Sequence, residues 1–210
     1  MTRMIAIAAA VIVAVALGAT YVATLGRGDQ DRFAQCRASS VAGGAGQIGG
    51  PFELVSETGE TVTDAQVIDR PALIYFGYTF CPDVCPMDVA RNAEAVDLLE
   101  ERGKIVKPVF ISIDPARDTP EVLAEWTDYI HPRMIGLTGS EAQVRAASRA
   151  YRTYFQAQAP KPGEEDFYLV DHSTMSYLTL PDHGFVEFFR RDETPESVAG
   201  RIACFLDAAK

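Results

Sequence analysis

The chain has 210 residues, a length that fits one ordinary domain with an appendage and leaves little room for two full domains. Its 19 Lys and Arg against 29 Asp and Glu give a formal charge of −10. That charge argues against nucleic acid as the main partner, because phosphate binding needs a basic surface. A hydrophobic content of 48% with 10% aromatic residues excludes a wholly disordered chain. Four cysteines are too few for a small disulfide scaffold and too many to ignore.

The first segment of the chain is apolar. No charged residue lies between positions 4 and 26, and most of those positions are Ala, Val, Ile or Leu. About 20 apolar residues span the core of a bilayer, so the run predicts an uncleaved membrane anchor over residues 1–27. A cleaved signal peptide is the alternative, because Ala14-Val15-Ala16 resembles a cleavage site, although it lies inside the run. In either case we expect export, and with an anchor the soluble domain lies in the periplasm or an equivalent extracytoplasmic space.

A single domain is expected after the anchor. Residues 28–51 are rich in Gly and Ala and predict a tether. Within residues 52–210, apolar runs typical of buried strands alternate with segments of helical periodicity. Strands are expected within 52–63 (a pair turning at Thr58-Gly59), 71–80, 106–114, 134–139 and 167–191 (a pair turning at 181–184), and helices at 87–102, 119–130, 140–154 and 194–208.

The order of these elements predicts the architecture. Strands that alternate with helices form a parallel core sheet. A closing antiparallel hairpin followed by a helix is the ending of a thioredoxin-like fold. We therefore expect an α/β protein with a thioredoxin-like fold, in which a central sheet has flanking helices, preceded by one N-terminal transmembrane helix.

The clearest chemical signal is the run Cys81-Pro82-Asp83-Val84-Cys85-Pro86, between a predicted buried strand and a predicted helix. Pro86 suits the first helical position, which puts Cys85 at or near the N-cap and Cys81 on the loop that folds back over the helix start. There the helix dipole and unpaired N–H groups favour thiolate over thiol. Two such thiolates can exchange with a disulfide or bind a soft metal.

The spacing of the two cysteines bears on that choice. Dithiol oxidoreductases typically place two residues between their cysteines, whereas three intervene between Cys81 and Cys85. The longer loop still allows a disulfide but separates the sulfurs more easily around a metal. Two thiolates suit Cu(I) and also Zn(II), but the other cysteines lie near the chain ends, so a four-ligand zinc site is not indicated. A plain disulfide that staples the loop stays open as the alternative.

A third ligand would have to be a histidine, and the chain has three. His131 lies at a predicted helix end, and His183 lies in a predicted turn. His172 follows an apolar run at the edge of a predicted core strand, which makes it the preferred ligand. A hydrogen-bonded structural histidine is the alternative at that position.

Charged residues near these positions have less specific roles. Asp83 could tune the site or meet a partner, but a solvated loop residue is the simpler interpretation. Asp171 could orient His172 or lie on the surface. We expect Asp114, Arg117 and Asp118 to fix their loop and cap the next helix rather than bind a metal.

At this point four segments carry a resemblance to a known family. Residues 81–86 look like the CPxxCP-type loop of the Sco/SenC family. Residues 75–80, 112–119 and 168–173 also resemble segments of that family, in the same order. The resemblance covers roughly residues 50–208.

The resemblance implies a membrane-anchored, thioredoxin-like copper chaperone that helps assemble the binuclear copper centre of cytochrome c oxidase. The family's copper ligands carry over to Cys81, Cys85 and His172, for Cu(I), Cu(II) or both. The implied partner is the copper-bearing subunit of the oxidase, with other copper carriers or thiol reductants besides. The alternative is an enzyme, a thiol–disulfide oxidoreductase in which Cys81 and Cys85 form a redox-active pair that keeps the oxidase cysteines reduced.

Cys36 and Cys204 remain outside the proposed site. Cys36 precedes the domain, and Cys204 lies in the last predicted helix. In an oxidising compartment a disulfide between them would attach the tether to the domain. The alternative is a buried free Cys204 and an exposed Cys36.

Overall fold

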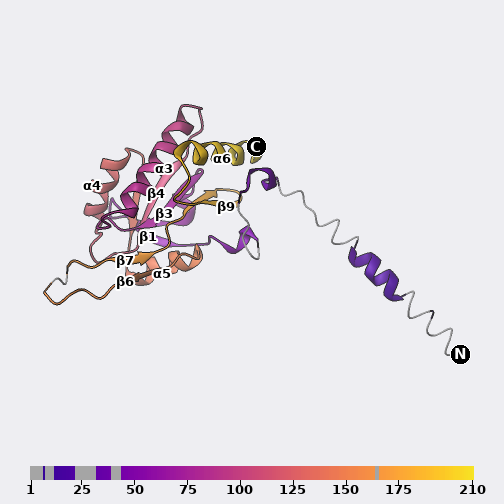
Figure 1. Ribbon diagram of the computed structural model, residues 1–210, viewed down its shortest axis with the longest axis horizontal. Helices are drawn as coiled ribbons and strands as arrows, with labels where there is room; N and C mark the ends of the chain where they lie inside the picture. Colours follow the sequence, from indigo (N-terminus) through magenta and orange to yellow (C-terminus); the bar gives the residue numbers. More distant parts are fainter. Residues whose placement is uncertain (1–6, 8–11, 22–31, 39–43, 164–165) are drawn as a thin grey trace. The chain divides into compact units, whose positions relative to one another are not determined.

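The computed structural model describes residues 7, 12–21, 32–38, 44–163 and 166–210 (Figure 1). The chain divides into two compact units, Met1–Gln35 and Cys36–Lys210. In the first unit residues 12–21 are helical, and most of the predicted anchor over residues 1–27 lies outside the described residues. Among the residues that are described, no helix is both long enough and apolar enough to cross a membrane.

The second unit contains the strands and helices of an α/β fold. The strands are β1 (Glu53–Ser56), β2 (Thr61–Thr63), β3 (Ala72–Gly77), β4 (Lys107–Ser112), β5 (Ile135–Thr138), β6 (Phe155–Ala157), β7 (Val170–His172), β8 (Ser176–Leu180) and β9 (Gly184–Phe189). The α-helices are α2 (Asp64–Val67), α3 (Val84–Glu100), α4 (Pro120–Ile130), α5 (Glu141–Ala150) and α6 (Pro195–Ala208). Two short 3-10 helices precede them, η1 (Ala34–Cys36) and η2 (Ala45–Gln47).

Seven strands form one mixed sheet in the order β2-β1-β5-β4-β3-β8-β9. β3, β4 and β5 run parallel, whereas β1 joins β5 and β8 joins β3 in antiparallel pairs. β6 and β7 form a separate two-stranded antiparallel sheet. The mixed sheet with flanking helices confirms the predicted α/β class, while the transmembrane helix stays a prediction.

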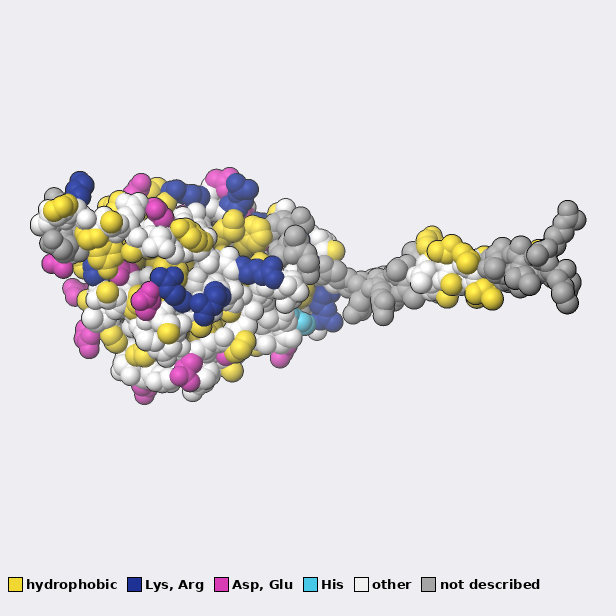
Figure 2. Space-filling view, turned by 90° about the horizontal axis from the view of Figure 1, so that it is seen from below, with side chains coloured by type: hydrophobic (Ala, Val, Ile, Leu, Met, Phe, Trp, Pro, Cys, Tyr) yellow, Lys and Arg dark blue, Asp and Glu magenta, His cyan; other side chains and the backbone are white. Residues whose placement is uncertain are grey.

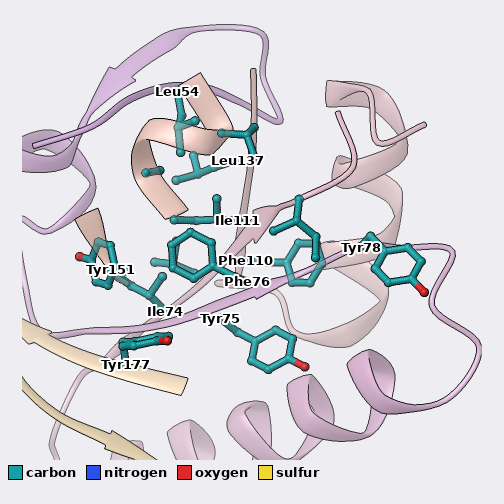
Figure 3. Close-up of a cluster of buried hydrophobic side chains, with 14 of the residues drawn as sticks. Leu54, Ile74, Tyr75, Phe76, Tyr78, Phe110, Ile111, Leu137, Tyr151 and Tyr177 are labelled. Atoms are coloured by element: carbon teal, nitrogen blue, oxygen red, sulfur yellow. The ribbon is translucent and has the colours of Figure 1, made fainter. Parts of the chain in front are cut away.

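The apolar run of β3 lies at the centre of the core. All six of its residues are buried, and successive side chains point to opposite faces of the sheet. Leu54, Ile111 and Leu137 pack together, whereas the Tyr75 hydroxyl points away from them toward α3 (Figure 3). α3 and α6 pack against each other on the face of the sheet toward which the Tyr75 hydroxyl points, and α5 lies on the opposite face (Figure 1).

The surface of the folded unit carries charges of both signs. On the face drawn in Figure 2, acidic and basic side chains are interspersed among hydrophobic and uncharged ones. Some large hydrophobic side chains are exposed, among them Phe80 and Met87 on either side of the two free cysteines in sequence.

Three helix starts behave as their sequences predict. The hydroxyl of Thr119 accepts a hydrogen bond from the Val122 N–H at the start of α4. Ser140 caps α5 and Thr194 caps α6 in the same way. These side chains satisfy backbone N–H groups that have no partner inside the helix, so each helix begins at its capping residue.

The segment 167–191 departs from the prediction of a single strand pair. Two separate pairings occur there, β7 with β6 and β8 with β9. β6 has three residues, of which two are exposed, so it lacks the apolar pattern that identifies strands in a sequence. His172 therefore lies in the small sheet, opposite Phe155, and not at the edge of a core strand.

Two helix boundaries also differ from the prediction. α3 begins at Val84 with Asp83 as its N-cap, so Cys85 lies inside the first turn. α5 ends at Ala150 instead of continuing toward residue 154, because Arg152 adopts a positive φ of 51° that a right-handed helix does not allow.

Residues 44–51 belong to the predicted tether but lie against the folded unit. The Gly49 N–H donates to the Ala150 carbonyl at 2.9 Å, and Arg152 donates to the Gln47 side chain at 2.6 Å. Ile48 packs against the core. This end of the tether is therefore part of the fold.

Cys36 and Cys204 form a disulfide, with their Cα atoms 5.7 Å apart and a separation of 168 positions in the sequence. The bond connects η1 to α6, two elements at opposite ends of the chain. Cys81 and Cys85 are free thiols. The four cysteines thus fall into a bonded pair and a free pair.

Gly77, the last residue of β3, lies close to one of the free cysteines. A Cβ there would come within 3.0 Å of the Cys85 sulfur and within 2.9 Å of the Tyr75 and Phe110 rings. We expect Gly77→Ala to lower the free energy of unfolding by about 1–3 kcal/mol, because overpacking forces neighbours to move. Urea denaturation measures the change. Gly200→Ala is the matched control: an added Cβ there meets nothing within 4 Å, so this variant should be no less stable than the wild type. A Gly77→Ala variant with the stability of the wild type would contradict the expectation.

The disulfide should contribute strongly to stability, because it restricts the unfolded chain over a long loop. We expect Cys204→Ser to lower the free energy of unfolding by about 2–5 kcal/mol. Denaturation of the oxidised wild type, the reduced wild type and the variant measures the effect. The reduced wild type should match the variant, and a variant as stable as the oxidised protein would refute the prediction.

Candidate metal centre

Two cysteines and one histidine from distant parts of the chain converge beyond the end of β3. Cys81 lies on the loop after β3, Cys85 in the first turn of α3, and His172 at the end of β7. Their sulfur and ring-nitrogen atoms all lie within 4.8 Å of one another. The Cys85 Sγ is 3.3 Å from the His172 Nε2. The fold thus brings together the three residues selected from the sequence, and their role as ligands stays a prediction.

The other two histidines do not belong to this group. His131 is buried, with Nε2 3.1 Å from Asp97 Oδ1 and Nδ1 accepting a hydrogen bond from the Arg133 N–H. His183 is exposed in the turn between β8 and β9. His131 is therefore a hydrogen-bonded structural residue.

Asp118 fixes the loop that carries Cys81. Its buried carboxylate accepts hydrogen bonds from the Thr79 N–H (3.1 Å), the Thr79 hydroxyl (2.6 Å) and the Ser112 hydroxyl (2.6 Å). Burial raises the pKa of Asp118, and these three bonds oppose the rise. Asp118 therefore ties the start of the loop to the end of β4, which confirms its expected role in fixing the loop, whereas Thr119 and not Asp118 caps the next helix.

Arg117 holds the loop between β6 and β7 in place beside the loop that carries Cys81. Its guanidinium lies 3.6 Å from the centroid of the Tyr168 ring and 4.7 Å from that of Phe80. Its Nε pairs with Asp114 Oδ2 at 2.5 Å, and the Tyr168 hydroxyl donates to Asp114 Oδ1 at 2.7 Å. Asp114 and Arg117 therefore have the loop-fixing role that the sequence predicted.

The His172 ring is held with one nitrogen directed at the sulfurs. Its Nδ1 lies 2.9 Å from the Ser173 carbonyl oxygen. Because a carbonyl only accepts, Nδ1 carries the proton and Nε2 presents its lone pair. The rings of Tyr75 and Tyr78 stand edge-on to the imidazole, at centroid distances of 6.3 and 5.9 Å. Burial lowers the pKa of His172, which favours the neutral, metal-binding form.

Two acidic residues beside the site point elsewhere. Asp171 is exposed and accepts a hydrogen bond from the Gln158 amide at 2.9 Å, so it is a surface residue and does not orient His172. Asp83 is also exposed, and it contributes through its backbone N–H, which bonds to Cys81. Neither carboxylate belongs to the group of converging ligands.

The two thiols differ in acidity. Burial raises the pKa of Cys81, but hydrogen bonds from the backbone N–H groups of Asp83 and Cys85 bring that pKa below its ordinary value. Burial raises the pKa of Cys85, and the neighbouring Cys81 thiolate adds to the rise. Cys81 is therefore the more acidic thiol of the pair, and a metal bound to Cys85 would displace the proton of its thiol.

A buried polar network lies under the site. The Tyr75 hydroxyl donates to Asp88 Oδ2 at 3.0 Å, and Asp88 Oδ1 lies 3.9 Å from Arg91. Arg91 in turn donates to the Ser176 hydroxyl (2.9 Å) and the Arg190 carbonyl (2.6 Å). Burial raises the pKa of Asp88. The network ties α3 to β8 and holds Tyr75 beside His172. The sequence indicates this network only weakly, through Asp88 and Arg91, two polar residues three positions apart on the buried face of α3.

Two sulfurs and one imidazole nitrogen form a soft donor set. In the described part of the chain, no further Cys, His or carboxylate joins the group, whereas a structural zinc site is closed by four ligands. Thiolate and imidazole ligands in this number suit Cu(I). The arrangement is therefore that of a thioredoxin-like protein with a compact group of three donor atoms that suits a soft metal.

The chain belongs to the SCO1/SenC family, whose family model matches residues 41–207. Protein SenC of Rhodobacter capsulatus is 56% identical over 203 residues, which cover 97% of this chain and 90% of SenC. The mitochondrial SCO1 homologue of Homo sapiens is 40% identical over 161 residues, or 76% of this chain and 53% of the human protein. The chain thus spans most of its bacterial relative and about half of the human one.

Solved structures share the fold. Arabidopsis thaliana ScoI with copper bound superposes with a TM-score of 0.71 at 38% identity, covering 76% of this chain and 99% of that structure. Yeast Sco1 with copper bound gives a TM-score of 0.71 at 36% identity, covering 77% of this chain and 89% of that structure. Relatives with this fold therefore hold copper.

The lowered pKa of His172 predicts a pH dependence of the metal-free protein. The unfolded chain protonates this histidine near its ordinary pKa of about 6.5. The folded protein does so only at lower pH, so stability falls as pH drops below about 6.5 and is unaffected above it. We expect His172→Gln to remove this part of the pH dependence. Urea denaturation between about pH 7.5 and about pH 5 measures the free energy of unfolding of the wild type and of His172→Gln. If that free energy falls equally with pH in both proteins, the expectation is wrong.

Proposed function

We propose that this protein is a copper chaperone that binds copper through Cys81, Cys85 and His172 and delivers it to the copper-bearing subunit of cytochrome c oxidase. The convergence of two thiols and one imidazole within 4.8 Å carries the proposal. Copper-bound relatives with the same fold support the choice of metal. The proposed recipient site is the binuclear copper centre of the oxidase, as the Sco/SenC family resemblance implies.

The geometry suits transfer of copper as cargo. Three protein ligands leave room for an incoming thiolate, so copper can pass to a partner by ligand exchange without being released into water. Loading requires the Cys85 proton to leave, since the pKa of that thiol is raised in the metal-free protein. His172 needs no deprotonation, because its Nε2 already presents a lone pair toward the sulfurs.

A thiol–disulfide oxidoreductase is the second candidate, and the unequal acidity of the two cysteines favours it. The Cys81 thiolate would attack a disulfide of the oxidase subunit, forming a mixed disulfide and releasing one partner thiolate. Cys85, after losing its proton, would then attack Cys81 and release the second. The partner gains two electrons, Cys81 and Cys85 become a disulfide, and an external thiol reductant resets them.

We further propose that residues 1–27 anchor the protein in a membrane, that residues 28–51 connect the anchor to the domain with their last part, 44–51, packed against it, and that residues 52–210 form a copper-binding domain in the periplasm or an equivalent space. The uncharged run over residues 4–26 supports the anchor. The disulfide between Cys36 and Cys204 supports an oxidising compartment, because such bonds rarely persist in the cytosol.

Copper titration of the reduced full-length protein in detergent tests the proposed function. We expect the wild type to take up one equivalent of Cu(I) in competition with a chromophoric chelator. His172→Ala should bind at least about tenfold more weakly, because a ligand is lost. Removal of Cys85 by substitution with Ser should have a larger effect, since it takes away a thiolate.

His183→Ala is the matched control, because this histidine lies in an exposed turn outside the ligand group. It should bind copper as the wild type does. Unchanged copper affinity in His172→Ala, together with intact thiol exchange by Cys81 and Cys85, would favour the oxidoreductase instead.

A further inference from the structure

An apolar groove lies directly beside the cysteine loop. It has a volume of about 380 Å³ and is lined by residues of that loop and of α4: Thr79, Phe80, Val122, Glu125, Trp126 and Tyr129. Phe80 immediately precedes Cys81, so their Cα atoms are about 3.8 Å apart. A molecule seated in the groove would therefore contact the residue that directly precedes Cys81 in the chain.

The walls of the groove expose aromatic surface to water. Phe80 is 50% exposed and Tyr129 is 88% exposed. Trp126 is held in place by its contact with Phe110, at 4.5 Å between ring centroids. Arg117 packs over the Phe80 ring and fixes it. Exposed apolar surface on rigidly held rings is typical of an interaction site, because isolated domains tend to bury such side chains.

The exposed face of α4 next to the groove is acidic. Glu121, Glu125 and Asp128 are all exposed and lie four and three positions apart, which places them on one side of the helix. None of them forms an ion pair with another residue in the part of the chain that the structure describes. Their charge therefore remains available to a basic partner.

We propose that this groove docks the protein that receives copper, through a segment that carries an apolar or aromatic side chain with Lys or Arg beside it. The proposal rests on the proposed function, and it names the copper-bearing oxidase subunit as the occupant. The two cysteines expose little surface that a partner could contact, since Cys81 is 6% exposed and Cys85 is fully buried. Docking beside Cys81 would bring a partner thiolate to the site, and the acidic rim would speed encounter at low salt.

The test is copper transfer from the loaded full-length protein in detergent to the soluble copper-binding domain of the oxidase subunit. The double variant Glu125→Lys, Tyr129→Ser alters the groove without touching the ligands. The matched control is Glu94→Lys, Ile105→Ser, which makes the same kinds of change at exposed positions away from the groove. Association is measured by titration, and transfer by stopped flow at low and high salt.

We expect the groove variant to associate about tenfold more weakly and to transfer copper more slowly, with a smaller dependence on salt. Its affinity for Cu(I) should equal that of the wild type, and the control should behave as the wild type throughout. A groove variant that associates and transfers like the wild type overturns the docking proposal alone. If the copper-loaded wild type delivers no copper, the proposed function is wrong, and the docking proposal that rests on it is wrong as well. Weaker self-association of the variant with unchanged transfer would assign the groove to a second copy and also overturn the proposal.

Discussion

The 3.3 Å contact between the Cys85 sulfur and the His172 imidazole joins segments 87 positions apart in the chain. Much of the surrounding structure serves this contact. Gly77 leaves space for the sulfur, the Ser173 carbonyl selects the tautomer of His172, and Tyr75 is held beside the ring by Asp88. These contacts hold the Cys85 sulfur and the His172 imidazole in one fixed arrangement.

The sequence predicts most of the core and less of the site's surroundings. Apolar runs identify β3 and β4 because strands buried on both faces have no polar alternation, and capping residues such as Thr119 mark helix starts through local hydrogen bonds. β6 was not predicted, because two of its three residues are exposed and it forms only by pairing with β7. Such pairing between distant segments leaves no local pattern in the sequence. The network of Asp88 and Arg91 was not predicted for the same reason, since its partners are distant in sequence. The residues of the candidate site were found from spacing, residue type and family resemblance, while the convergence of Cys85 and His172 needed the fold.

The two chemistries proposed for Cys81 and Cys85 exclude each other at any one moment. Copper needs both sulfurs as thiolates, and a disulfide between Cys81 and Cys85 would remove both ligands. Under the proposed function, copper occupancy would therefore be linked to the redox state of the two cysteines. The lower pKa of Cys81 is compatible with both proposed roles, because a thiolate is the nucleophile in disulfide exchange and also the form that binds a metal.

The disulfide between Cys36 and Cys204 joins the tether to the last helix well before the first strand. In a chain anchored as proposed, residues 28–35 alone then separate the membrane from the folded unit. They span at most about 28 Å, whereas residues 28–51 fully extended would span about 80 Å. A shorter link confines the domain to a smaller volume and raises its effective concentration at the membrane surface. If the proposed anchor is present, a covalent bond far in sequence from Cys81 and Cys85 would thus limit how far the folded unit can reach from the membrane.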